Sequence, residues 1–160
     1  MLLWRLRARL GYWLARRLFH WRWLLQQPRV WHWMQGQYAR MAALGDVPAQ
    51  SFYGHILLFR GQGFGAREEG LRLLRLAAQG GDGKAAYQVG VQSLAGDSRQ
   101  APDAAEAARW WEKAAEAGHP LAAQRLAVLY REGGPGLAAD PLRADALARR
   151  AESLGFRPKA

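Results

Sequence analysis

Four glycines at a nearly constant spacing constrain the fold of this chain more than any other feature. Gly45, Gly81, Gly118 and Gly155 are separated by 36, 37 and 37 residues. Small residues recur four and nine positions after each of the first three glycines: Ala49 and Gly54, Ala85 and Gly90, Ala122 and Ala127. Self-similarity with a period of roughly 20–50 residues is typical of stacked repeats, in which one unit cannot bury its apolar face alone. The sequence therefore predicts a solenoid.

Each full repeat is predicted to fold as two helices joined by a Gly-rich turn. The repeats cover residues 45–80, 81–117 and 118–154, with first helices at Pro48–Phe59, Lys84–Leu94 and Leu121–Arg131 and second helices at Ala66–Gln79, Ala104–Ala117 and Pro141–Leu154. Asp103 and Asp140 stand just before second helices, where an aspartate caps free backbone N–H groups. The repeat glycines suit the left-handed backbone that ends many helices.

The residues in phase with this spacing resemble the Sel1-like repeats, a subgroup of the tetratricopeptide-type α-solenoids. The middle repeat is the most similar to the family pattern: Ala85, Val89-Gly90, Gly96, Asp103, Ala107, Trp110-Trp111, Ala114-Ala115 and Gly118. Leu57 and Ser93 stand where the family has tyrosine, and Ala127 where it has glycine. The resemblance covers about 110 residues. It implies an all-α fold, a short right-handed solenoid of stacked antiparallel helix pairs, and the function of a non-catalytic bacterial adaptor that holds a protein partner.

The resemblance also implies where a partner binds. In the family, the concave surface is lined largely by the first helix of each pair. The candidates for partner contact at such positions are Gln50, Tyr53, Tyr87, Gln88, Gln124 and Arg125. The alternative for Tyr53 and Tyr87 is that they pack between repeats. Three repeats form a short groove, which suits a peptide or a single helix.

The N-terminal part of the chain has a different character, because it concentrates the positive charge. The net charge is +10, and residues 1–45 carry eight arginines and no carboxylate. Residues 1–27 are predicted to form one amphipathic helix that ends before Pro28. Its apolar stripe is Leu3, Leu6, Leu10, Leu14, Leu18, Trp21 and Leu25, and Arg5, Arg9 and Arg16 lie on the opposite side with Trp23 nearby.

Two hypotheses for this helix remain open, with a third that is weaker. Its leucine stripe can cap the first repeat and leave the arginines in water. Alternatively, the helix lies on anionic lipid through Arg5, Arg9, Arg16 and Trp23. Nucleic acid is the weaker alternative partner. The uncharged runs are too short for a transmembrane span or a secretory signal. We therefore expect a cytoplasmic protein, with peripheral attachment to the inner membrane as the alternative.

Residues 28–156 are predicted to form the solenoid, beginning with a half repeat at 28–44, and residues 157–160 form a tail. No arrangement of residues in the sequence indicates catalysis. There is no cysteine, and the four histidines share no metal-ligand spacing with one another. The Gly-rich segment 61–65 follows a predicted helix and lacks the lysine of a phosphate loop, so we interpret it as a turn. We predict no catalytic residue, no metal ligand and no cofactor.

Overall fold

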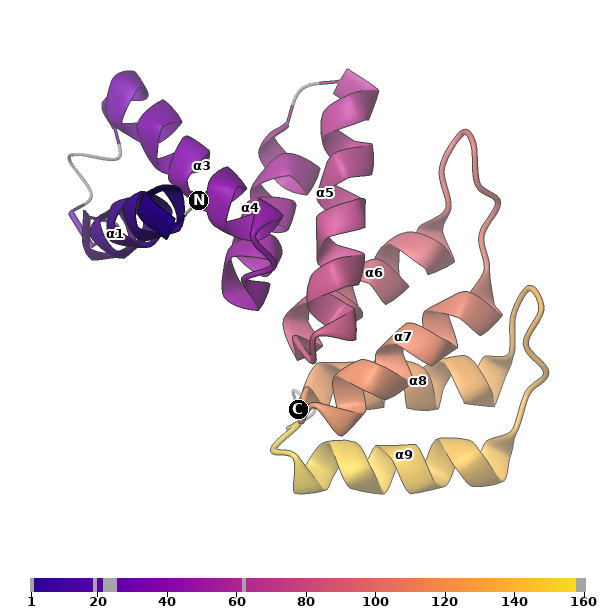
Figure 1. The fold of residues 1–160 in the computed structure, drawn as a ribbon. Helices are drawn as coiled ribbons and strands as arrows, with labels where there is room; N and C mark the ends of the chain where they lie inside the picture. Colours follow the sequence, from indigo (N-terminus) through magenta and orange to yellow (C-terminus); the bar gives the residue numbers. More distant parts are fainter. Residues whose placement is uncertain (1, 19, 22–25, 62, 158–160) are drawn as a thin grey trace. The chain divides into compact units, whose positions relative to one another are not determined.

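The computed structural model describes residues 2–18, 20–21, 26–61 and 63–157, and its regular elements are helices (Figure 1). They are α1 (Leu2–Leu18), α3 (Pro28–Ala43), α4 (Val47–Arg60), α5 (Gly63–Gln79), α6 (Gly83–Ala95), α7 (Ala104–Glu116), α8 (Pro120–Glu132) and α9 (Pro141–Ser153). The chain divides into two compact units, residues 1–73 and 74–160. The predicted all-α solenoid class is confirmed. Two helix boundaries differ from prediction by more than one residue: α1 ends at Leu18 rather than at residue 27, and α5 begins within the expected turn, at Gly63.

The glycine spacing reflects a repeated requirement of the backbone. Gly45, Gly81, Gly118 and Gly155 have φ angles of +87°, +95°, +84° and +94°. A Cβ on any of them would meet nothing within 4 Å, so packing does not select these glycines. The amide of each glycine donates to the carbonyl three residues earlier, and the amide of the next residue donates to the carbonyl five residues earlier. In the first turn, Gly45 donates to Ala42 at 3.0 Å and Asp46 donates to Met41 at 3.1 Å. This pair of bonds is the Schellman motif, which needs a left-handed residue.

The residue after each of the first three glycines then begins the next helix. The Asp46 and Asp82 carboxylates accept from amides three residues on, at 2.8 and 2.7 Å. His119 takes the same place, with its Nδ1 accepting from the Ala122 amide at 3.2 Å. One residue thus closes one helix and caps the following one. Only two residues therefore separate the last helical residue of one repeat from the residue that caps the first helix of the next.

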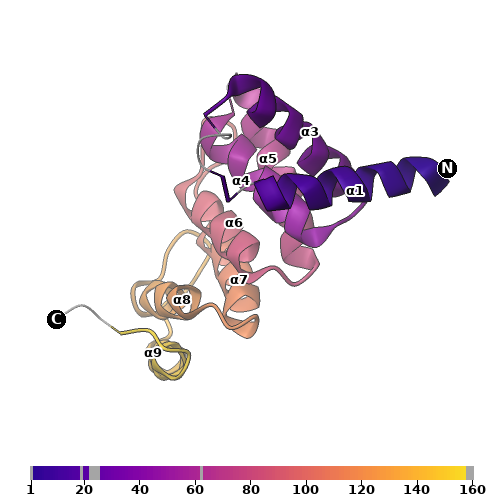
Figure 2. The same cartoon turned by 90° about the vertical axis from the view of Figure 1, so that its left-hand side faces the viewer.

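In the unit of residues 1–73, α1 lies against α3 in both views (Figures 1 and 2). The buried side chains that form this core come from α1, α3, α4 and α5: Ala8, Tyr12, Ala15, Met34, Tyr38, Met41, Ala42, Ala49 and Leu73. The Tyr12 ring meets the Tyr38 ring edge-on, with centroids 5.1 Å apart. Aromatic pairs favour this edge-to-face arrangement.

In the unit of residues 74–160, α6 pairs antiparallel with α7, and α8 with α9 (Figure 1). Alanines and Gly90 line the contacts between these helices and let them approach closely. Trp111 of α7 is 1% exposed and fills the space above Gly90. A smaller cluster of Ala115, Ala123 and Ala151 joins α7, α8 and α9, with Leu154 and Phe156 packed against it.

Candidate functional site

One face of α6 and the equivalent face of α8 remain accessible in the second unit. On α8 this face carries Leu121, Arg125 and Val128, which are spaced by four and three residues and so share one side of the helix. All three are exposed, with Leu121 at 37% and Val128 at 40%. The residues 37 positions earlier, Lys84, Gln88 and Val91, take the same places on α6. We call these six residues the first-helix face.

Packing at the start of α6 holds this helix against the turn that joins α7 to α8. The Tyr87 ring stacks on the His119 imidazole with centroids 4.7 Å apart and an interplanar angle of 11°. A Cβ on Gly83 would lie 3.0 Å from Cβ of Ala117, so this glycine also permits a close approach. Burial, and then the Lys84 ammonium, lower the pKa of His119. The imidazole is therefore neutral near pH 7, as its role as a hydrogen-bond acceptor requires.

The six residues predicted to contact a partner differ in how accessible they are in the structure. The expected exposure of Gln50 is wrong: its side chain is 7% exposed, and its Nε2 donates to the Ala42 carbonyl at 3.1 Å. Tyr53 is half-buried and packs against the core of its unit. Tyr87 is half-buried between the Trp111 and His119 rings, so it packs between repeats. Packing within the units therefore reduces the surface that these three side chains can offer to a partner.

The other three candidates, Gln88, Gln124 and Arg125, keep accessible surface. Gln88 and Gln124 are half-buried, and Arg125 is exposed. Gln88 and Arg125 belong to the first-helix face, being 37 residues apart. Sequence reasoning missed the apolar members Leu121, Val91 and Val128. The in-phase spacing of 84, 88 and 91 with 121, 125 and 128 is the signal that locates them.

A second accessible surface lies on α1, and it shows that the leucine stripe is not the face by which this helix packs. The stripe expected to pack on the first repeat is exposed at Leu6 (49%), Leu10 (67%) and Leu14 (43%). The buried face is the opposite one, formed by Ala8, Tyr12 and Ala15. Two alanines allow a closer helix–helix approach than leucines do, and a tyrosine between them fills the remaining gap.

Tyr12 ties α1 to the start of α4. It lies near the carboxylate of Asp46, the residue that caps α4. Burial, followed by this carboxylate, raises the pKa of Tyr12 to about 12. The tyrosine therefore stays neutral over the physiological pH range.

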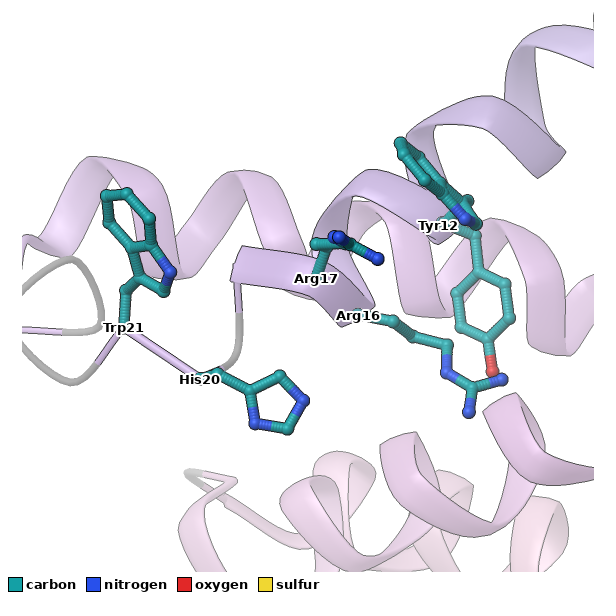
Figure 3. Close-up of a pocket in the computed structure, with 6 residues that line it drawn as sticks. Tyr12, Arg16, Arg17, His20 and Trp21 are labelled. Carbon is teal, nitrogen blue, oxygen red and sulfur yellow. The ribbon is translucent and has the colours of Figure 1, made fainter.

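Of the four residues predicted to contact lipid or another polyanion, two have side chains that the structure describes. Arg9 and Arg16 are exposed on α1, and the Arg16 guanidinium lies 5.9 Å from the centre of the Tyr12 ring. The side chains of Arg5 and Trp23 lie outside the described residues. Arg16 also lines a hollow of about 660 Å³ together with Tyr12, Trp13, Arg17, His20 and Trp21 (Figure 3).

A larger hollow of about 890 Å³ opens between α1 and α3. Its lining includes leucines, a tryptophan and arginines: Leu6, Leu10, Leu14, Trp33, Arg7 and Arg40. Among the described helices, none combines the length and apolar character needed to cross a bilayer. Within the same part of the chain, no three His, Asp or Glu side chains gather closely enough to hold a metal ion.

The chain is similar to known proteins in structure. No family model matches it, and no curated protein does either. A Sel1 repeat protein from Oxalobacter formigenes is 32% identical over 74% of this chain and 88% of that one, with a TM-score of 0.63. A protective antigen of uropathogenic Escherichia coli that displays an SLR fold is 23% identical, with a TM-score of 0.68 over 77% of this chain and 26% of the antigen. The second likeness concerns the fold alone, whereas the first extends to sequence over most of the relative. The chain therefore belongs to the Sel1 repeat proteins.

Proposed function

We propose that this protein is a non-catalytic scaffold that binds a short segment of a protein partner on the first-helix face of α6 and α8. The observation that carries the proposal is the exposed set Leu121, Arg125 and Val128 on α8. At the equivalent positions of α6, Lys84 is exposed and Gln88 and Val91 are half-buried. Repeat proteins of this kind use the surface formed by successive equivalent helices for binding. A Sel1 repeat fold supports the same general role.

The chemistry of the face indicates what the segment contains. Leu121 and Val128 offer apolar surface at the two ends, and Arg125 lies between them. From 121 to 128 the helix rises by about 10 Å, which matches about three residues of an extended peptide. Lys84 occupies the position on α6 that Leu121 has on α8. The segment we expect therefore has apolar side chains on either side of an aspartate or glutamate.

The test uses the full chain and a displayed library of random 12-residue peptides. We expect the enriched peptides to combine apolar residues with a carboxylate. Their affinities are then measured by fluorescence anisotropy for the wild type and for the single variants Leu121→Asp and Arg125→Glu. A residue that contacts the peptide directly should lower affinity by about tenfold or more when its chemistry is reversed.

Leu142→Asp is the matched control for Leu121→Asp. Leu142 lies on α9, outside the first-helix face, and is 85% exposed. The control makes the same change of side chain and charge, so it should alter peptide affinity by less than about twofold. Melting temperatures of the variants show that each one is folded. Equal losses for Leu121→Asp and Leu142→Asp, or a library with no enriched peptide, would contradict the proposal.

A further inference from the structure

The helix α1 has an apolar face that the fold leaves uncovered. Leu6, Leu10 and Leu14 follow one another at intervals of four, and Trp13 beside them is 60% exposed. This face is opposite the buried face of Ala8, Tyr12 and Ala15, which fixes the helix on α3. The leucines are therefore presented by an anchored helix. Trp33 of α3, 40% exposed, extends the apolar surface across the hollow between the two helices.

Arginines border this apolar face on both sides. At 100° per residue, Arg7 lies along one edge and Arg9 and Arg16 along the other. Arg17 lies within the face, with its guanidinium 5.8 Å from the centre of the Trp13 ring. All four arginines are exposed. An apolar strip bordered by cations is the pattern of a helix that lies flat in a membrane interface.

Charge decides which occupant this face accepts. The first 45 residues contain no carboxylate, and Asp46, the first one in the chain, already accepts from the Ala49 amide. A second copy docked face to face would bring arginines against arginines, with no acid in this segment to offset them. A bilayer containing anionic lipid suits both the leucines and the arginines, because it offers an apolar boundary beneath a layer of phosphates.

The smaller hollow supplies a place for a phosphate beside the leucines. Trp13 and Trp21 border it together with Arg16, Arg17 and His20. Figure 3 shows the Arg16 guanidinium beside the Tyr12 hydroxyl, while His20 and Trp21 lie toward the other end. Arginine donors suit phosphate oxygens, and tryptophan is enriched at the depth of lipid headgroups.

We propose that α1 lies flat on an anionic phospholipid surface, with Leu6, Leu10 and Leu14 in the acyl boundary and the bordering arginines on lipid phosphates. This attachment is independent of peptide binding on the first-helix face. It places the repeat protein, and whatever segment it holds, at a membrane surface. The hollow lined by Leu6, Leu10, Leu14 and Trp33 then receives the upper part of an acyl chain.

The experiment measures co-sedimentation of the full chain with vesicles. Vesicles of phosphatidylcholine with about a quarter phosphatidylglycerol should bind the protein, and pure phosphatidylcholine vesicles should bind it far less. Raising NaCl to about 0.5 M should weaken the binding, because salt screens the arginines. Equal binding to the two vesicle types, or no binding to either, would overturn the proposal.

Matched variants test the apolar and the cationic parts separately. Leu10→Asp should abolish most of the binding, whereas Leu142→Asp, the same change on α9, should leave it intact. Arg7→Gln with Arg17→Gln should weaken binding roughly 10- to 30-fold, since each basic residue near an anionic surface contributes about a factor of five. Arg109→Gln with Arg149→Gln removes two exposed arginines of the other unit and should change little.

Two results would assign the α1 face otherwise. If Leu10→Asp and Leu142→Asp sediment alike with anionic vesicles, the leucines do not enter the membrane. The other result is that the protein does not bind vesicles and sedimentation equilibrium shows a dimer, which Leu10→Asp dissociates. In that case the α1 face binds a second copy of the chain. Leu10 is 67% exposed, so the variant should keep its melting temperature, and that measurement accompanies each binding assay.

Discussion

Gly90 of α6 lies beneath the indole of Trp111 of α7, so close that a Cβ on the glycine would be 2.5 Å from the ring. The indole N–H donates to the Tyr87 carbonyl at 3.0 Å, which fixes the ring in this position. The pair explains why a glycine and an aromatic residue belong to the same repeat. The helix that supplies the glycine can approach its partner only where that Cβ is missing.

Gly90→Ala should therefore destabilise the protein, although alanine is the better helix former. The gain in helix propensity is up to about 1 kcal/mol, whereas overpacking against a fixed ring costs about 1–3 kcal/mol. We expect the melting temperature to fall by several degrees in thermal unfolding followed by circular dichroism. Gly36→Ala is the control, because a Cβ there meets only the flexible end of Arg40 at 3.7 Å. A rise in melting temperature for both variants would show that the Trp111 ring moves aside freely.

The two adjacent tryptophans of α7 should differ sharply in their contribution to stability. Trp111 is 1% exposed, whereas Trp110 is half-buried and bonds to Glu106 at 3.3 Å. Trp111→Ala should lower the free energy of unfolding by about 3–5 kcal/mol, as large-to-small changes in a core do. Trp110→Ala should lower it by about 1 kcal/mol. Urea denaturation measures both, and equal losses would mean that the contacts of Trp111 do not stabilise the repeat.

The capping histidine should make stability fall as the pH falls. Folding lowers the pKa of His119 from its ordinary value near 6.5. Below that value the unfolded chain binds more protons than the folded one, so the free energy of unfolding decreases as the pH drops from about 7.5 to about 5.5. A protonated Nδ1 also loses the bond from Ala122.

His119→Asn isolates this contribution, because asparagine caps a helix without titrating. Urea denaturation at the two pH values should show that the wild type loses stability relative to the variant at the lower pH. The other titrating groups are common to both proteins and cancel in the difference. A difference that does not change with pH would exclude His119 as the source.

The repeat architecture was predictable because the glycine spacing records a local requirement. Each of Gly45, Gly81 and Gly118 has a positive φ that other residues rarely adopt, so the requirement is visible in the sequence. The caps at Asp46 and Asp82 follow the same spacing and were equally open to prediction. The sequence-based prediction placed caps only at the starts of the second helices, at Asp103 and Asp140.

Surface and packing were harder to predict, because they depend on the fit between elements distant in the chain. Gln50 was predicted to be a surface residue, but its side chain is buried and donates to the Ala42 carbonyl at the end of α3. Tyr87 was a candidate for partner contact, but the ring of His119, 32 residues later, stacks on it. For α1, hydrophobicity favoured the leucine stripe as the packed face. In the structure the face of Ala8 and Ala15 packs instead, because these small side chains let α1 approach α3 closely.

The last prediction tests that choice of face directly. Ala15 is fully buried where α1 meets α3, so Ala15→Leu should overpack the contact and cost about 1–3 kcal/mol even though it adds apolar surface. Leu14, the neighbouring residue, is 43% exposed, and Leu14→Ala should change the free energy of unfolding by less than about 1 kcal/mol. Urea denaturation of both variants gives the answer. If the leucine stripe were the packed face, the order would reverse and Leu14→Ala would be the costlier substitution, by about 2–5 kcal/mol.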